Sequence, residues 1–334
     1  MTRHTAAAMT GITMNKPMIR EGEHAYRVDA GWMKLPDGLA IGDVPGVAVD
    51  RNDNVYVFSR NDHPVMVFDR DGNFLRSWGE GQFVRPHGAF AGPDDSIWLT
   101  DDAAHVVRKY DLTGRLLLTL GQAGTPLAFL SGQPFNRCTN VAIGLQGEIY
   151  VSDGYKNAAI HKFAPDGRLM KSWGRPGYRP GEFALPHDIA CDRDGLLYVA
   201  DRENYRIQIF DGEGVWQGEW TEVFRPLGIC AVEMGGEKRF VVAVGAPGVG
   251  PISDWSGMGP FVCILDETGR CLARLGDGKP GNGPGQFISP HGIAVDSRQN
   301  IYLGEVARNS WKKYFAESVP ADLKTFQKLE KMTA

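Results

Sequence analysis

The chain repeats one pattern six times, and this repeat constrains the fold more than any other feature of the sequence. The six units occupy residues 43–79, 83–121, 135–174, 183–220, 224–276 and 287–315. Each unit holds about four short apolar runs separated by Asp, Gly and Asn turns, which is the pattern of strands joined by hairpins. Repeats of roughly 40 to 50 residues with four strands each are typical of β-propeller blades. The sequence therefore predicts an all-β chain folded as a six-bladed β-propeller.

The ends of the chain determine how such a ring closes. The sixth unit stops one strand short, and residues 24–35 have strand character. We expect this N-terminal strand to complete the last blade, because closure removes exposed strand edges. Residues 1–23 are predicted to be a flexible arm and residues 24–315 the propeller. Residues 316–334 are predicted to form a short C-terminal helix, packed on the disc or on a second subunit, because Leu323, Phe326 and Leu329 are spaced by three.

A Pro-His pair recurs in three of the six units, in the segments VRPHGAF, ALPHDIA and ISPHGIA. Its histidines are His87, His187 and His291, each at the start of the innermost strand, and in a propeller these starts surround the central channel. Alternate blades of a six-bladed ring lie about 120° apart, so the three imidazoles should converge. Three protein ligands with an open position are the pattern of a catalytic zinc. Imidazole also suits Fe, Co, Ni or Cu, so the pattern leaves the metal open.

The alternative is that Pro-His is repeat consensus without chemistry. The equivalent places in units one, three and five hold Gly46, Thr139 or Asn140, and Leu227 or Gly228. Simple copying does not explain a histidine in alternate units only. We therefore favour the metal site.

Three further side chains follow the second strand of their units at nearly the same position. They are Arg60, Tyr155 and Arg202, and they should project from one face of the disc. Two guanidinium groups and a phenol near a metal suggest a small-molecule substrate with a carboxylate held bidentately. The alternative for each arginine is a structural ion pair, with Asp62 or Glu203.

Composition excludes several other classes of protein. The net charge is −4 with both signs interspersed and without a long basic block, so nucleic acid and anionic membranes are not expected partners. No apolar run reaches the length of a membrane span, and the N-terminus lacks a signal-peptide core. Five cysteines without a Cys-x-x-Cys pair argue against a disulfide framework, so we expect a cytoplasmic protein.

Residues 245–259 lack the Lys-Ser/Thr ending of a phosphate loop and are predicted to lie over one mouth of the channel.

Several segments resemble one known family in the same order along the chain. PHG, VSDGYKN, LPHDIA, ADRENYRIQIF and SPHGIAVD with IYLGE are similar to segments of the peptidyl-α-hydroxyglycine α-amidating lyases, six-bladed propellers of the NHL-repeat superfamily, over about residues 43–315. The resemblance implies a zinc ion held by His87, His187 and His291. It also implies a catalytic tyrosine at Tyr155 and active-site arginines at Arg60 and Arg202. That family cleaves the N–C bond of an α-hydroxylated glycine and releases an amide and glyoxylate.

Two positions depart from the family pattern. Gly292 stands where the family has an aspartate that helps to bind a structural calcium, so calcium is not expected here. Lys156 follows Tyr155 where secreted members have a disulfide, so that bridge cannot form. Two rival functions stay open. One is another metal-dependent propeller enzyme such as a lactonase or hydratase, and the other is a non-enzymatic NHL scaffold that binds protein or RNA through basic or aromatic stripes.

Overall fold

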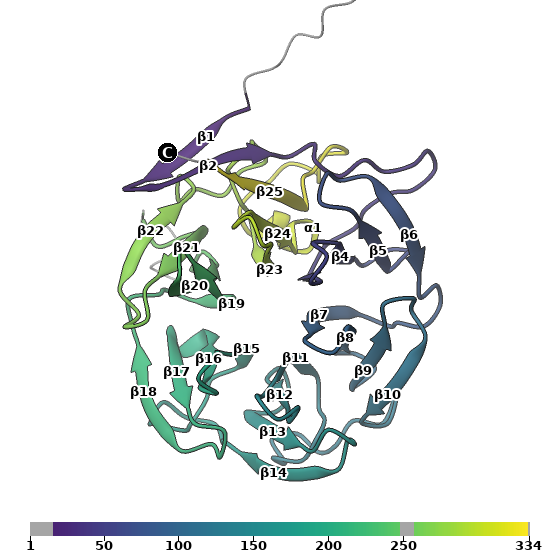
Figure 1. The fold of residues 1–334 in the computed structure, drawn as a ribbon, viewed down its shortest axis with the longest axis vertical. Helices are drawn as coiled ribbons and strands as arrows, with labels where there is room; N and C mark the ends of the chain where they lie inside the picture. The colour runs from purple at the N-terminus through teal and green to yellow at the C-terminus, as the bar shows by residue number, and fades with distance from the viewer. Residues whose placement is uncertain (1–15, 248–256, 333–334) are drawn as a thin grey trace, which may run out of the picture.

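The computed structural model describes residues 16–247 and 257–332. Six antiparallel sheets surround a central channel, as Figure 1 shows. This arrangement confirms the predicted six-bladed β-propeller. Residues 1–15 of the predicted arm and residues 248–256 of the predicted loop over the channel lie outside the described residues. Within the described part of the chain, no helix is long and apolar enough to cross a membrane.

The first five blades each contain four strands, which follow the chain from the channel outward. Their bounds are β3 (Gly46–Val49), β4 (Val55–Phe58), β5 (Val65–Phe68) and β6 (Phe74–Trp78); β7 (Pro86–Gly92), β8 (Ser96–Asp101), β9 (Val106–Asp111) and β10 (Leu116–Leu120); β11 (Cys138–Ile143), β12 (Ile149–Asp153), β13 (Ala159–Phe163) and β14 (Leu169–Trp173); β15 (Pro186–Cys191), β16 (Leu197–Asp201), β17 (Arg206–Phe210) and β18 (Trp216–Trp220); and β19 (Pro226–Met234), β20 (Glu237–Val244), β21 (Phe261–Leu265) and β22 (Cys271–Leu275).

The sixth blade joins the two ends of the chain. Its order from the channel outward is β23 (Pro290–Val295), β24 (Ile301–Glu305), β25 (Phe326–Lys331), β2 (His24–Asp29) and β1 (Met18–Glu21). Strand β2 pairs antiparallel with β25, and the two lie side by side in Figure 1. The predicted closure by an N-terminal strand is therefore confirmed.

The predicted C-terminal tail is corrected in its secondary structure. Residues 326–331, expected within a helix, are strand β25, which supplies ladder partners to both β24 and β2. Spacing by three could not distinguish these states, because a strand buried on both faces shows no alternation. A short helix is present earlier, as α1 (Ala307–Ser310) followed by the 3-10 turn η2 (Trp311–Lys313). Strand β1 likewise lies within the region predicted to be a flexible arm.

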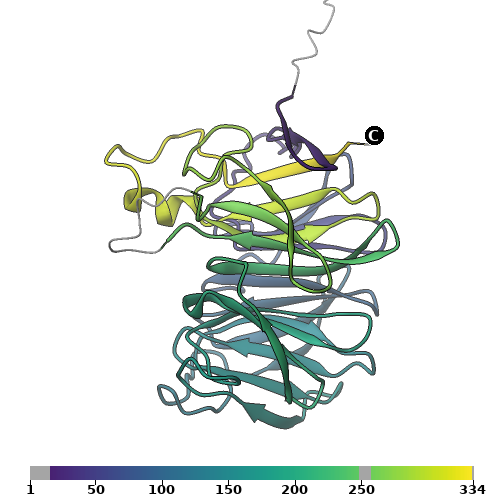
Figure 2. The ribbon, with the colours of Figure 1, turned by 90° about the vertical axis from the view of Figure 1, so that its left-hand side faces the viewer.

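The core lies between neighbouring blades, where apolar side chains of adjacent sheets pack together. One cluster joins blades five and six and includes Val241, Ile264, Ile301 and Leu329, all of them buried. Figure 2 shows that α1 and the chain after it project from one face of the disc. The side chains of Trp311 and Leu323 in this segment pack on Ile288, so the projection has a small core of its own.

A buried carboxylate at the end of the second strand fixes the loop before the innermost strand in four blades. Asp101 accepts hydrogen bonds from the backbone N–H groups of Val84 and Arg85. The other three are Asp153, Asp201 and Glu305, which accept backbone N–H groups of residues 136, 184 and 288–289 respectively. The sequence predicts this capping role for the three aspartates. Three of the four loops lead directly into a Pro-His pair.

Leu329 tests the corrected closure. Leu329→Ala should lower the free energy of unfolding by about 2–5 kcal/mol, because the side chain is fully buried between blades. Leu116→Ala on the outer strand β10, where the leucine is 51% exposed, should cost less than about 1 kcal/mol. Urea denaturation of both variants measures the difference, and equal costs would contradict the assignment of residue 329 to a buried strand.

Glu305 gives a pH-dependent signature. Burial raises the pKa of Glu305 to about 7, so the folded state binds this proton more tightly than the unfolded state does. Protonated Glu305 therefore stabilises the folded state fully below the pKa that Glu305 has in the unfolded chain, and this stabilisation is lost as the pH rises to about 7. The stability of the wild type relative to Glu305→Gln should therefore fall by on the order of 3 kcal/mol between pH 4 and about 7. Urea denaturation across this range measures it. Glu330→Gln, at a partly exposed glutamate of β25, is the control, and a pH-independent difference for Glu305→Gln would contradict the account.

Candidate metal centre

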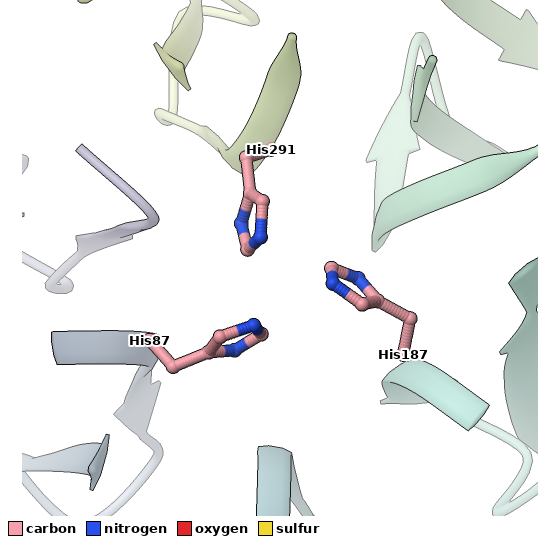
Figure 3. Close-up of side chains that lie close together, drawn as sticks. All are labelled: His87, His187 and His291. Carbon is pink, nitrogen blue, oxygen red and sulfur yellow. The ribbon is translucent and has the colours of Figure 1, made fainter. Parts of the chain in front are cut away.

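The three Pro-His histidines converge at the centre of the ring, as predicted. His87, His187 and His291 lie near the starts of β7, β15 and β23, and Figure 3 shows their imidazoles pointing toward one another. The ring centroids are 4.7–5.0 Å apart, and one nitrogen from each ring lies within 4.8 Å of the others. All three side chains are buried.

Each imidazole is held by a backbone carbonyl of the next blade. The Nδ1–H of His87 donates to the Thr139 oxygen at 2.7 Å, that of His187 to Leu227 at 2.6 Å, and that of His291 to Pro45 at 2.7 Å. A carbonyl can only accept, so Nδ1 carries the proton and Nε2 keeps its lone pair. Blades one, three and five thus orient the histidines of the alternate blades.

The histidines are uncharged at neutral pH. Burial, and then the positive charge of Arg60, holds the pKa of His87 well below its usual range. Burial lowers the pKa of His187 and His291 in the same way, with Arg202 and His87 as the next causes. Three neutral Nε2 atoms with fixed rings form a donor set that fits zinc or another divalent transition metal. The structure brings the predicted ligands together, and their metal role remains a prediction.

Tyr155 lies directly against this centre. Its hydroxyl is 3.0 Å from Nε2 of His87 and 3.1 Å from Nε2 of His187. The residue follows β12 through Gly154, where a Cβ would lie 2.2 Å from the Pro186 carbonyl oxygen. Only glycine permits this close approach, so the Asp-Gly-Tyr sequence places the phenol at the channel.

The two predicted arginines also lie at the centre but differ in their partners. Arg60 donates from Nε to the Pro86 carbonyl at 3.0 Å and, in the described part of the chain, forms no ion pair with Asp62. Arg202 opens the 3-10 turn η1 (Arg202–Asn204) and pairs with Glu203 at 2.8 Å, as the structural alternative predicts. Its guanidinium nevertheless lies 5.6 Å from the centre of the Tyr155 ring.

Sequence reasoning missed three further arginines at this mouth. Arg85 and Arg137 lie 5.6 and 5.1 Å from the centre of the Tyr155 ring, and both pair with Asp102. Arg225 pairs with Glu203. A signal was available: each of the three directly precedes the innermost strand of its blade, and in blade two this is the position before the Pro-His proline.

A channel of about 200 Å³ runs beneath the histidines along the innermost strands. Its wall mixes polar and apolar groups and includes the buried carboxyl group of Asp188, whose pKa burial raises to about 7. Asp188 accepts hydrogen bonds from the Ile229 and Ile189 N–H groups and from Asn140, which ties three blades together. At Gly292 an added Cβ would lie 2.8 Å from the Gly46 Cα, so a carboxylate there would require the backbone to shift.

This fold and site define the class of protein: a six-bladed propeller with a buried three-histidine centre. The NHL repeat family model matches residues 183–210. NHL repeat-containing protein 3 of Homo sapiens is 31% identical over 313 residues, covering 86% of this chain and 84% of that protein. Peptidyl-α-hydroxyglycine α-amidating lyase 1 of Drosophila melanogaster is 31% identical over 256 residues, covering 70% of this chain and 45% of that protein. The chain belongs to the family of NHL-repeat propellers that includes these two proteins, which confirms the resemblance.

A solved structure supports the fold alone. A gluconolactonase from Xanthomonas campestris superposes with a TM-score of 0.62 at 12% identity, covering 98% of this chain and 99% of that one. At this identity the likeness shows that both chains are propellers.

Removal of one histidine tests the metal centre. The wild type should bind about one zinc per chain, and His187→Ala should lose it, because two imidazoles remain where a zinc site uses three or more protein ligands. His63→Ala is the matched control, since His63 pairs with Glu80 on a partly exposed loop. Elemental analysis after dialysis measures the metal. Full occupancy in His187→Ala would contradict the ligand set.

Proposed function

We propose that this protein is a metal-dependent lyase that cleaves the C–N bond of an α-hydroxy-amide or related carbinolamide. The products are an amide or amine and an aldehyde such as glyoxylate. The observation that carries the proposal is the position of the Tyr155 hydroxyl, within hydrogen-bond distance of two of the three converging histidines. Membership of a family that includes amidating lyases supports the same reaction.

His87, His187 and His291 would hold the metal, which we propose to be zinc. A bound zinc supplies Lewis acidity, which lowers the pKa of a hydroxyl group at the site. The three imidazoles are suited to this task because their carbonyl partners fix them before a metal arrives.

Tyr155 acts as general base on the substrate hydroxyl. It removes the O–H proton, the O–H electron pair forms the C=O bond, and the C–N electron pair departs with the nitrogen. The nitrogen then takes up one proton, so the atoms and charges of substrate and products balance. The guanidinium groups near the phenol ring stabilise the negative charge that a base needs.

Arg60 and Arg202 hold the carboxylate next to the reacting carbon. Arg60 keeps its Nη groups free of any carboxylate in the described part of the chain, and Arg202 uses Nε for Glu203. A guanidinium with free Nη groups can bind a substrate carboxylate through two hydrogen bonds. Holding the carboxylate orients the carbinol carbon toward Tyr155.

We also propose a cytoplasmic location and a small-molecule partner for this protein. The five cysteines are unpaired thiols, which supports a reducing cytoplasm. The net charge of −4 supports a small-molecule partner over nucleic acid or membrane. The competing functions are a lactonase-like hydrolase or hydratase and a non-enzymatic scaffold, since the propeller fold by itself is compatible with both.

Tyr155→Phe tests the reaction. The variant should retain zinc and lose about 100- to 10,000-fold in turnover, because it lacks the general base. The assay follows glyoxylate released from N-acetyl-α-hydroxyglycine, and zinc content is measured in parallel.

Tyr178→Phe is the control, since Tyr178 is 75% exposed. Turnover of Tyr155→Phe equal to that of the wild type would remove Tyr155 from the mechanism. A zinc-loaded wild type that releases no glyoxylate would favour the hydrolase or the scaffold.

A further inference from the structure

The mouth of the site contains two clusters of the same composition, each with two arginines around one carboxylate. The Asp102 triad consists of Arg85, Asp102 and Arg137, and the Glu203 triad consists of Arg202, Glu203 and Arg225. In both, the acid follows the second strand of one blade, and one arginine comes from the loop before the innermost strand of the next blade. The two triads thus span blades two to five.

In the Asp102 triad, one arginine already satisfies the acid. Arg85 donates from Nε to Oδ1 at 2.7 Å and from Nη2 to Oδ2 at 2.5 Å, a bidentate pair. Arg137 adds a second guanidinium to Oδ2, from Nη2 at 2.7 Å. Since Asp102 is buried and carries one negative charge, the second guanidinium leaves a net charge of about +1 on the triad.

The surplus charge faces the site. The side chains of Arg85 and Arg137 are 37% and 25% exposed, whereas Asp102 is fully buried beneath them. Both guanidinium groups also lie within 5.6 Å of the centre of the Tyr155 ring. The N–H groups of Arg85 and Arg137 that do not bond to Asp102 are therefore available beside the Tyr155 phenol.

The other triad and two neighbours increase the positive charge. The Glu203 triad has the same excess of one guanidinium. Arg60 has no acid partner among the described residues. Burial, and then the charges of Arg225 and Arg202, lowers the pKa of Lys313, which is the effect that a positively charged surrounding has on a lysine. Since arginines outnumber the acid in both triads, the mouth is suited to more negative charge than one carboxylate provides.

We propose that the substrate carries a second acidic group and that Arg85 and Arg137 bind it, while Arg60 and Arg202 hold the carboxylate beside the reacting carbon. This inference rests on the proposed function for the place of the first carboxylate. The substrate class is an N-acylated α-hydroxyglycine whose acyl part ends in a carboxylate. Two guanidinium groups fixed by one buried acid form a pre-organised anion site, because the acid restrains both side chains before a ligand arrives.

The direct test compares unreactive ligands that differ by one carboxylate. N-acetylglycine carries one carboxylate. N-succinylglycine and N-glutarylglycine carry two, and the distance between the two carboxylates differs by one methylene group. None has the hydroxyl group, so none is cleaved, and binding to the zinc-supplied full chain is measured by isothermal titration calorimetry. The better of the two dianions should bind at least about tenfold more tightly than N-acetylglycine.

Arg137→Gln locates the second subsite. Asp102 keeps its bidentate partner Arg85 in this variant, so the fold should be retained, and thermal melting checks this. The preference for the dianion should fall from about tenfold to less than about threefold. Arg85→Lys, which keeps the charge but loses the bidentate geometry, should lower the preference as well. Arg115→Gln, at a 76% exposed ion pair near β10, is the control and should keep the full preference.

The outcomes separate this inference from the proposed function. Equal affinity of the wild type for the mono- and dicarboxylates would overturn the second subsite, whatever the turnover. A preference that survives in Arg137→Gln would overturn its assignment to the Asp102 triad. A preference that Arg137→Gln abolishes supports the subsite even if neither N-acetyl-α-hydroxyglycine nor N-succinyl-α-hydroxyglycine yields glyoxylate, and that second result would refute the lyase alone.

Discussion

The hydrogen bond from each imidazole Nδ1 to a carbonyl of the next blade is the interaction on which the site depends. It joins blades two, four and six to blades three, five and one, so every blade takes part in the centre. It also fixes the tautomer, which leaves three Nε2 lone pairs facing the axis. A histidine in every blade would bring six imidazoles to the axis, more than the three or four protein ligands that a zinc site uses.

The rest of the ring keeps these partners in register. Closure by β2 and β25 binds the sixth blade to the N-terminus, so His291 and Pro45, which lie at opposite ends of the propeller sequence, can meet. The carboxylates at the ends of the second strands hold the loops that lead into the histidines. The same face then displays Tyr155 and the arginines. Fold and chemistry are coupled here, because the loops that carry charge are also the loops that the capping acids restrain.

The sequence was sufficient for the fold and for the positions of the three histidines and of Tyr155, because all of them follow the repeat. Period and turn residues predicted six blades, and equivalent positions predicted where His87, His187 and His291 converge. The end of the chain departed from the repeat, because residues 306–325 insert a helix and a loop before β25. Strand β25 could not be predicted, since a strand buried on both faces lacks the alternation of polar and apolar residues. Arg85, Arg137 and Arg225 share a repeat position that could have pointed to them, but the acids that link them across blades are visible only in three dimensions.

The central claim is that one metal ion binds to three imidazole nitrogens at the centre of the ring. Anomalous diffraction at the zinc absorption edge, from crystals of the zinc-supplied protein, tests it directly. The account predicts a single strong peak on the channel axis, about 2.0–2.1 Å from Nε2 of His87, His187 and His291. A peak bound by other side chains, or none at the axis under zinc-saturating conditions, would contradict it.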